Sequence, residues 1–286
     1  MLAGRGGDAL ILGYNTNGFS QHSISAAIEF IAQLGYESIA ISLDRGILHP
    51  PGRSRVRKAI DLLKPLLDAT GVRVTIETGA RYVLDPHRKH YPTLISRSPA
   101  ERRRRVEFLK DAVEIAAALS ADSVSLWSGA PDADEPRAAL FDRLVGGLQE
   151  TLDHAAQRNV RLSFEPEPDM LIDTMAGFET LYDRLEHPMF GLTLDVGHVH
   201  CLNDGDLAKH IHRWHHVLWN VHVEDMRRGV HEHLMFGEGE MDFASVFDAF
   251  SAAEYAGPVH VELSRHSHAA EEAARKSYDF LRTFIC

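Results

Sequence analysis

Eight short apolar runs alternate with stretches of helical periodicity along the chain, and this alternation constrains the fold more than any other feature of the sequence. The runs lie at residues 9–14, 37–43, 72–77, 122–127, 160–165, 190–195, 217–223 and 258–262. Short apolar runs separated by helical stretches are typical of buried parallel strands joined by helices. Because no linker rich in proline, glycine or serine interrupts the alternation, we expect residues 1–286 to form one domain of the α/β class, a closed (β/α)8 TIM barrel.

The predicted helices carry start and stop signals. Ser98 can cap a helix that begins at Pro99, and Glu101 can complete a capping box. Gly35 and Gly71 stand just before the next predicted strands, where a left-handed residue would end each preceding helix. These signals support the same order of strands and helices.

Charge and cysteine content exclude several classes of protein. The formal net charge is −11 at pH 7, which disfavours a nucleic-acid surface because phosphate contacts need a basic footprint. The two cysteines, Cys201 and Cys286, provide no disulfide framework, and we find neither a signal-peptide core nor a run of about 18 apolar residues. We therefore expect a cytoplasmic protein with no nucleic-acid partner and no membrane segment.

Four acidic or imidazole side chains stand at the ends of predicted strands: Glu165, Asp195, His222 and Glu262. The carboxyl ends of parallel strands converge at one face of a barrel, so these side chains should meet at one point. Carboxylates crowded in a buried pocket raise each other's pKa, and burial raises it further. A divalent cation resolves this conflict, and we therefore predict a metal site.

The donor atoms of this quartet indicate which ions fit. Three carboxylates and one imidazole, without a thiolate, suit Mn²⁺ or Zn²⁺, and Co²⁺ or Mg²⁺ are also compatible. Open coordination positions would accept two vicinal oxygens of a hydroxy-ketone, whose enediolate form is stabilised by a Lewis acid. A small polyhydroxylated carbonyl compound would suit such a site.

Three segments, in their order and spacing, resemble a known family. They are LDVGH at residues 194–198, VHVED at 221–225 and FGEGEMDF at 236–243. They are similar to the sugar isomerase/epimerase-like family of xylose isomerase-like TIM barrels, which also includes endonuclease IV. The resemblance covers nearly the whole chain and is strongest from Glu165 to Glu262.

The resemblance implies roles for the same four residues. Glu165, Asp195, His222 and Glu262 correspond to the divalent-metal ligands of the family. One of Glu165 and Glu262 would remove a proton from one side of the substrate while the other returns one, as an isomerase or epimerase requires.

The resemblance also suggests contacts beyond the quartet. His198 resembles a family histidine that hydrogen-bonds substrate or takes part in a multi-metal centre. Arg228 lies near the position where some ketose epimerases bind substrate with an arginine, and Arg227 is an equal candidate. Asp225 can either orient His222 or cap the following loop.

Two histidines, His231 and His233, leave the number of metal ions open. Endonuclease IV has an Asp-x-His pair at this place, so these residues are candidates for an additional metal site if an extended backbone aims them together. They can equally be exposed loop histidines. Two observations argue against a trinuclear centre. Strands two and three lack the histidines that endonuclease IV has at their ends, and the remaining candidates, His22 and His49, lie in loops further from the strand ends.

The connection between the third strand and the helix at Pro99 is unusually long, and it is basic. Loops at the carboxyl ends of barrel strands stand over the active site, so this loop can act as a lid. We hypothesise that Arg81 or Arg88 grips an anionic group of the substrate, phosphate or carboxylate. A solvated loop and a contact in a homo-oligomer are the alternatives.

Three other features have structural interpretations. Trp127, at the end of strand four, can be a platform for the apolar face of a sugar or a core aromatic residue. We expect His260 to point from the barrel toward the helices rather than to bind metal. The arginines at residues 102–105 are expected to form a solvated helix face.

Together these features predict a divalent-metal-dependent isomerase or epimerase of a sugar, sugar phosphate or cyclitol. A dehydratase or lyase would use the same chemistry, a phosphodiesterase of the endonuclease IV type would need three ions, and a metabolite-binding barrel could keep the metal without catalysis. Metal stoichiometry separates the isomerase from the phosphodiesterase, since the former needs one ion per chain.

Overall fold

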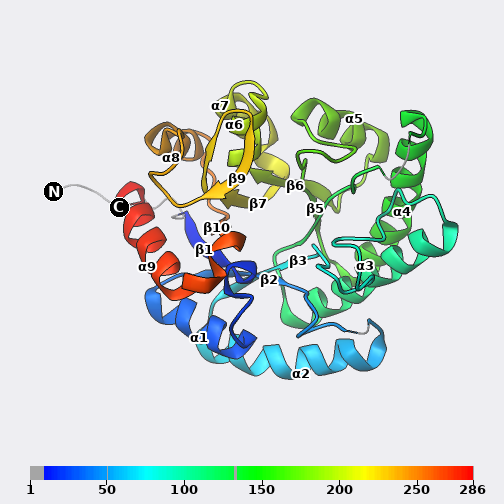
Figure 1. Ribbon diagram of the computed structural model, residues 1–286, viewed down its shortest axis with the longest axis horizontal. Coiled ribbons are helices and arrows are strands. Elements are labelled where there is room, and N and C mark those ends of the chain that lie inside the picture. The colour runs from blue at the N-terminus through cyan, green and yellow to red at the C-terminus, as the bar shows by residue number, and fades with distance from the viewer. Residues whose placement is uncertain (1–9, 50, 132–133, 286) are drawn as a thin grey trace.

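The architecture is a closed barrel of eight parallel strands surrounded by helices (Figure 1). The computed structural model describes residues 10–49, 51–131 and 134–285. Around the barrel the strands follow the order β1-β10-β7-β6-β5-β4-β3-β2. Their bounds are β1 Ile11–Asn15, β2 Ser38–Ser42, β3 Arg73–Glu77, β4 Val124–Leu126, β5 Leu162–Phe164, β6 Phe190–Asp195, β7 Leu218–Val223 and β10 Pro258–Val261. Each strand overlaps the apolar run that predicted it, so the (β/α)8 prediction is confirmed; Ala9 of the first run lies outside the described residues.

Helices join the strands and cover the outside of the barrel. They are α1 Ile24–Leu34, α2 Arg53–Thr70, α3 Pro99–Leu119, α4 Arg137–Arg158, α5 Met175–Leu185, α6 Val196–Leu202, α7 Leu207–Trp214, α8 Phe243–Ala252 and α9 Ala270–Leu281, with short 3-10 helices η1 Thr16–Phe19, η2 His215–Val217, η3 Ser264–Ala269 and η4 Arg282–Phe284. As predicted, α1 and α2 end at Gly35 and Gly71, whose φ angles of 104° and 71° lie in the left-handed region.

The start of α3 agrees with the prediction, but the capping box does not. The helix begins at Pro99 after Ser98, yet the Ser98 side chain makes no capping hydrogen bond. Glu101 instead accepts a hydrogen bond of 2.5 Å from the hydroxyl of Tyr91. Glu101 therefore binds Tyr91 of the long loop between β3 and α3 and does not complete the capping box.

Arginines of α3 hold this loop, and the prediction of a solvated face at residues 102–105 is wrong for Arg105, whereas Arg103 and Arg104 are exposed. Arg105 is 1% exposed, and its Nη2 donates to the carbonyl oxygen of Thr78 at 2.8 Å. Arg104 donates to the carbonyl oxygen of Leu84. A long loop without regular structure needs donors for its backbone carbonyls, and the helix supplies them.

Polar side chains fill the barrel interior below the mouth. Nδ1 of His260 lies 2.8 Å from Oδ1 of Asn220, and its Nε2 lies 2.9 Å from Oγ of Ser38. Gly13 of β1 leaves space for the ring, since a Cβ there would stand 2.2 Å from it. We expected His260 to point toward the helices, but it points into the barrel. Residues 260 and 262 lie on the same face of the strand, and Glu262 faces the barrel mouth.

A hairpin that the sequence pattern did not predict follows β7. Its strands β8 (Asp225–Arg227) and β9 (Val230–Leu234) form a separate antiparallel sheet. Both strands contain few apolar residues, so they lack the hydrophobic signal of the barrel strands. The extended backbone of β9 turns His231 and His233 to the same side.

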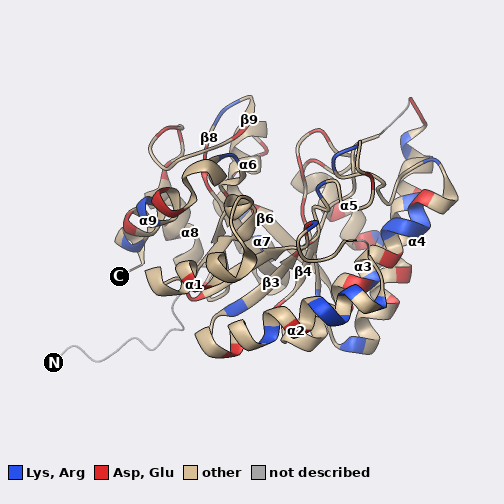
Figure 2. Cartoon of the chain, turned by 60° about the horizontal axis from the view of Figure 1, so that its bottom comes forward, with Lys and Arg blue, Asp and Glu red and all other residues tan. Residues whose placement is uncertain are grey.

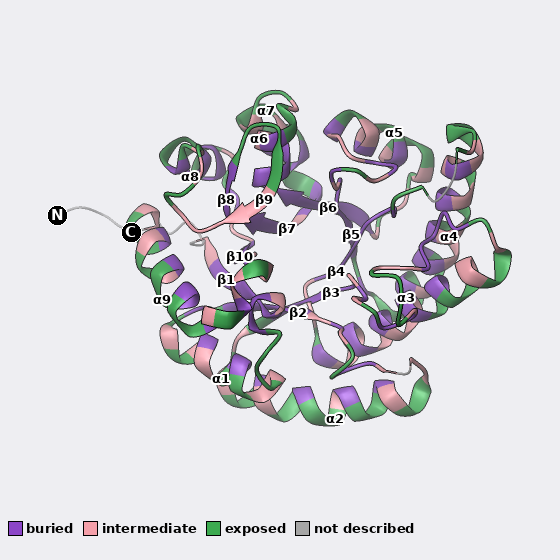
Figure 3. Cartoon of the chain, viewed as in Figure 1, coloured by how far each residue is buried: buried purple, intermediate pink, exposed green. Residues whose placement is uncertain are grey.

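The distribution of side chains follows the barrel. Buried residues concentrate in the strands and on the inner faces of the helices (Figure 3), whereas Lys, Arg, Asp and Glu lie mainly on helices and loops (Figure 2). Within the described ranges, no helix is both long and apolar enough to span a bilayer. Cys201 is a buried free thiol, and Cys286 lies outside the described residues.

Candidate metal centre at the barrel mouth

Four neighbouring strands bring the quartet together. β5, β6, β7 and β10 are consecutive in the barrel, and ligand atoms of Glu165, Asp195, His222 and Glu262 lie within 4.8 Å of one another. Nδ1 of His222 is 3.0 Å from Oε1 of Glu165 and 2.9 Å from Oε2 of Glu262. Three carboxylates and one imidazole thus converge at the carboxyl ends of the strands.

The ring of His222 is oriented by Glu77, the last residue of β3. Oε1 of Glu77 lies 2.9 Å from Nε2 of His222, and Asn220 donates to the same oxygen at 3.0 Å. Because a carboxylate only accepts hydrogen bonds, a proton on Nε2 of His222 can be donated to Glu77, while Nδ1 faces Glu165 and Glu262. This is the arrangement expected of a ligating histidine whose second nitrogen is held by an acceptor.

The charges of these groups depend on one another. Burial lowers the pKa of His222, but the surrounding carboxylates, Glu262 first, outweigh burial and hold the pKa well above its usual value. Burial raises the pKa of Glu165 to about 7. Burial also acts to raise the pKa of Glu262, yet His222 and His233 outweigh it and the pKa falls below its usual range. Two carboxyl groups displaced in opposite directions are typical of an acid and base pair.

The donor set fits a divalent ion. Oδ1 of Asp195 accepts a hydrogen bond of 2.9 Å from the backbone N–H of His198, whereas Oδ2 is buried and has no hydrogen-bond partner among the described residues. An ion with ligands at about 2.1 Å holds adjacent octahedral ligands about 3.0 Å apart. The contacts of 2.9 and 3.0 Å between His222 Nδ1 and the two glutamates match this spacing.

Glu262 is also held from the β1 side of the mouth. Nδ2 of Asn17, in η1, donates to Oε1 of Glu262 at 2.6 Å, while Oε2 of Glu262 faces His222. The sequence reasoning missed Asn17, because a neutral amide after the first strand carries no sign of a metal site. Its position shortly after a strand end was the one available signal.

A second cluster of ligand atoms lies beside the quartet. Nitrogen atoms of His198, His231 and His233 lie within 4.8 Å of one another, and Nε2 of His198 is 3.1 Å from Nε2 of His231. Nδ1 of His198 lies 3.2 Å from the carbonyl oxygen of Pro166, and Nδ1 of His233 lies 3.1 Å from that of Glu262. Backbone carbonyls therefore accept from both Nδ1 atoms. Burial lowers the pKa of His198 to about 4 and leaves its Nε2 lone pair available to a cation, whereas Glu224 and other carboxylates outweigh burial and hold the pKa of His233 well above its usual value.

Two further carboxylates border this histidine cluster. Glu167 lies 3.9 Å from Nε2 of His198 and 3.8 Å from Nε2 of His231. Glu224 is fully buried, stands 3.7 Å from Nδ1 of His233, and neither of its oxygens has a hydrogen-bond partner among the described residues. Burial raises the pKa of both carboxyl groups well above the usual value. Sequence reasoning gave Glu167 no definite role and missed Glu224, because nothing in the pattern marks a glutamate one residue past a strand as buried.

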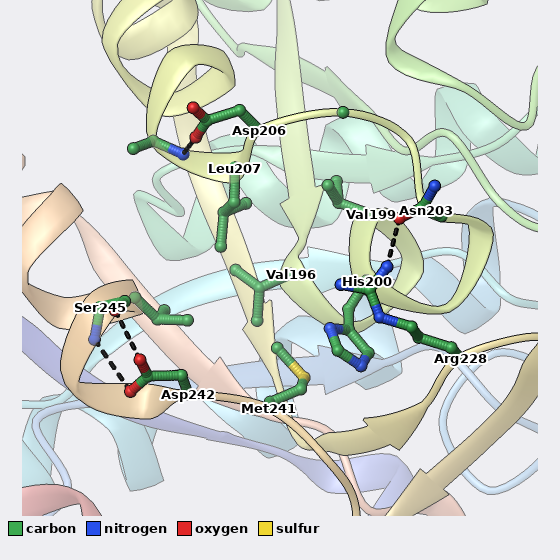
Figure 4. A pocket seen from close by; sticks show the side chains of 13 residues that line it. Val196, Val199, His200, Asn203, Asp206, Leu207, Arg228, Met241, Asp242 and Ser245 are labelled. Atoms are coloured by element: carbon green, nitrogen blue, oxygen red, sulfur yellow. Dashed lines mark hydrogen bonds between the residues drawn. The ribbon is translucent and has the colours of Figure 1, made fainter.

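The arginines of the hairpin do not contact the quartet. Arg228 hydrogen-bonds Oδ1 of Asn203 and lines a cavity of about 220 Å³ with His200 and Met241 (Figure 4). Arg227 donates to the carbonyl oxygen of Glu238 at 2.7 Å. Of the described contacts of these two arginines, none reaches a quartet residue.

Asp225 serves the loop that follows the hairpin. Its carboxylate accepts hydrogen bonds from the backbone N–H groups of Gly237, Gly239 and Met241 at 2.8, 2.9 and 3.2 Å. These bonds correspond to the loop-capping interpretation, and Asp225 does not orient His222, whose Nε2 faces Glu77.

The remaining candidate substrate contacts are separated. Trp127 is 7% exposed and packs against the guanidinium of Arg105 at 4.5 Å, which is the environment of a core aromatic residue. Arg88 is exposed and lies 3.4 Å over the ring of Tyr91. Arg81 lines a different cavity, above the first three strands. The sequence offered Arg81 and Arg88 as equal candidates for an anion-binding residue. In the structure only Arg81 lines a cavity, whereas Arg88 packs over Tyr91.

The fold and the site together define a TIM barrel with a cluster of acidic and imidazole ligands at its mouth. Comparison with known families makes the assignment specific. The chain belongs to the xylose isomerase-like TIM barrel family, which it matches over residues 28–284.

Several proteins that sequence or structure comparison finds similar to this chain are epimerases by name. The chain is 27% identical over 206 residues to L-ribulose-5-phosphate 3-epimerase UlaE of Shigella flexneri, a match that covers 71% of each protein. D-allulose 3-epimerase of Methylomonas sp., solved in complex with D-allulose, superimposes with a TM-score of 0.74 at 21% identity and covers 96% of this chain and 97% of that one. For the 3-keto-D-glucoside 4-epimerase YcjR of E. coli, the TM-score is 0.75 at 16% identity, with 96% and 99% covered. These two structures confirm the fold.

Proposed function

We propose that this protein is a sugar epimerase or isomerase that holds a divalent metal ion with Glu165, Asp195, His222 and Glu262. The observation that carries the proposal is the convergence of three carboxylates and one imidazole at the barrel mouth. Relatives named as epimerases of L-ribulose 5-phosphate and of D-allulose support the reaction class. Mn²⁺ or Zn²⁺ suits these donors best, and Co²⁺ or Mg²⁺ is also compatible.

The two glutamates that flank His222 would carry the proton transfers. Glu262, with its lowered pKa, is charged at neutral pH and can remove the proton from the carbon beside the carbonyl. Glu165, with a pKa of about 7, can hold a proton and return it. A divalent ion, when bound, supplies Lewis-acid stabilisation of the negative charge that develops on the substrate oxygens.

Substitution of the glutamates tests the proposal. Glu165→Gln and Glu262→Gln keep the size of the side chain but remove a proton acceptor and a negative ligand. We expect either variant to lower the rate of epimerisation roughly 10²–10⁴-fold and to weaken metal retention. Metal content by mass spectrometry separates the two effects, and Glu107→Gln, on the exposed surface of α3, is the matched control. Full activity in either variant would remove that glutamate from the mechanism.

The histidine cluster favours a second ion. His198, His231 and His233 offer imidazole nitrogens of the kind that bind Zn²⁺, and the unpartnered carboxylate of Glu224 would balance its charge. A phosphodiesterase of the endonuclease IV type would need a third ion. Among the described residues, His22 and His49 belong to no ligand cluster, so nothing supports that third site.

Metal stoichiometry tests the second ion. Protein saturated with Zn²⁺ should hold two ions per chain, and His233→Ala should hold one. His212→Ala, an exposed histidine on α7, is the control that should keep both. One ion per chain in the unaltered protein would refute the second site, and three ions would favour the phosphodiesterase.

A further inference from the structure

A cavity separate from the quartet opens on the opposite side of the barrel mouth. Its walls come from the loops that follow β1, β2 and β3 and from parts of α1 and α2, and its volume is about 720 Å³. Sites for small organic molecules span roughly 300–1,000 Å³. The quartet stands at the ends of β5, β6, β7 and β10, so both sites lie on the carboxyl-end face of one barrel.

One short helix joins the cavity to the quartet. Thr16 and Phe19 of η1 line the cavity, and Asn17 between them donates its hydrogen bond to Glu262. η1 therefore contacts both the cavity and Glu262.

Arg81 is the most informative residue of the cavity. It is half buried, and it makes no hydrogen bond or ion pair with another described residue. The charge of Arg81 acts on Lys89 and His90, whose pKa values fall mainly through burial and further through this charge. A half-buried guanidinium beside other basic groups lacks the counter-charge that such a group normally has.

A second arginine is held at the same cavity. Nη2 of Arg45 lies 3.4 Å from Nε2 of His49, whose Nδ1 lies 3.0 Å from the carbonyl oxygen of Val83. Asp44 is the one carboxylate among the described residues that line the cavity, and its Oδ1 accepts from the backbone N–H of Gly46 at 2.8 Å. Arg45 is exposed, and neither guanidinium has a carboxylate partner among the described residues, so the two arginines outweigh the single carboxylate of Asp44 in this cavity.

The rim of the cavity is apolar. Tyr82 and Leu62 are 42% and 41% exposed, which is unusual for large apolar side chains, and both line the cavity. Tyr82 has a φ of 53°, in the left-handed region that is uncommon for residues other than glycine. An exposed aromatic ring beside an unpaired guanidinium suits an anion on a carbon skeleton better than an inorganic ion.

We infer that this cavity binds the distal anionic group, a phosphate or carboxylate, of a sugar derivative, with Arg81 and Arg45 as the residues that bind the anion. The inference rests on the proposed function, because it assigns the far end of a substrate whose hydroxy-carbonyl end lies at the quartet. It selects Arg81 over Arg88, which lies over Tyr91 at the exposed surface.

Calorimetric titration of the full chain loaded with Mn²⁺ tests the inference. The probes are L-ribulose 5-phosphate, D-fructuronate and neutral L-ribulose. Both anions should bind more tightly than L-ribulose, and the tighter of the two identifies the anionic group. Arg81→Ala should weaken anion binding by about tenfold to a hundredfold and leave L-ribulose unchanged. Arg45→Ala should act in the same direction, and Arg57→Ala, on the exposed surface of α2, should change nothing.

The outcomes that overturn the inference are distinct from those that overturn the proposed function. Equal affinity for all three probes, or an equal loss for all three in Arg81→Ala, would overturn the anion site. Sedimentation velocity adds a further test, since a dimer that Arg81→Ala dissociates would make the cavity a subunit contact. If anion binding depends on Arg81 but no substrate C–H exchanges with solvent, the proposed function is refuted and the anion site stands. If C–H exchange of the anionic substrate is the same in Arg81→Ala as in the unaltered protein, the anion site is refuted and the proposed function stands.

Discussion

At the scale of single residues, His222 depends on a partner from a distant part of the chain. Glu77 lies 145 positions earlier in the sequence, yet its carboxylate accepts from Nε2 of His222. The convergence of the quartet could be predicted, because strand ends can be counted along the sequence. The orientation of the His222 imidazole could not be predicted, because it depends on which side chain of β3 reaches across the barrel.

Glu77→Gln should weaken metal binding about 10- to 100-fold, as expected for a group that orients a ligating histidine. The substitution keeps the side-chain size but removes the charge that favours a proton on Nε2. Competition with a fluorescent chelator for Mn²⁺ measures the change. Glu107→Gln should bind the ion as the unaltered protein does, and unchanged affinity in Glu77→Gln would show that Glu77 does not orient the ligand.

At the scale of elements, the barrel strands could be predicted and the mouth could not. The strands are apolar runs, whereas β8 and β9 are polar and are stabilised by pairing with each other and by Asp225. The sequence pattern predicted that the arginines of α3 form a solvated face. Arg105 is nevertheless buried, because the β3–α3 loop folds back over the helix. Burial lowers the pKa of Arg105 to about 9, so the guanidinium stays charged at neutral pH.

β1 depends on the absence of a side chain at Gly13. Gly13→Ala would bring a Cβ to 2.2 Å from the ring of His260, which cannot move easily because Asn220 and Ser38 hold both nitrogens. We expect a loss of about 1–3 kcal/mol in the free energy of unfolding, measured in urea.

Gly146→Ala is the matched control for this prediction. Gly146 lies on the exposed face of α4, and a Cβ there would meet nothing within 4 Å. Its substitution should stabilise the protein by about 0.5–1 kcal/mol. Equal effects of the two substitutions would contradict the close approach of β1 to His260.

At the scale of the whole molecule, the barrel mouth is divided between two kinds of chemistry. The ends of β5, β6, β7 and β10 carry the acidic and imidazole ligands, and the loops after β1, β2 and β3 form the basic cavity. The first half could be predicted from residue positions. The second half could not, because Arg45 and Arg81 come from different loops. Only the folded chain shows that Arg81 has no partner among the described residues, whereas Arg88 packs over Tyr91.

The measurement that tests the central claim most directly is exchange of substrate C–H protons with solvent. Mn²⁺-loaded protein is incubated in D₂O with L-ribulose, L-ribulose 5-phosphate and D-allulose, and proton NMR follows the hydrogen on the carbon beside the carbonyl. We predict loss of this signal for at least one ketose, removal of the effect by a chelator, and rates lower by roughly 10²–10⁴-fold in Glu165→Gln and Glu262→Gln. Absence of exchange with every ketose, or exchange at full rate in both variants, would contradict the claim that the quartet moves protons on a metal-bound sugar.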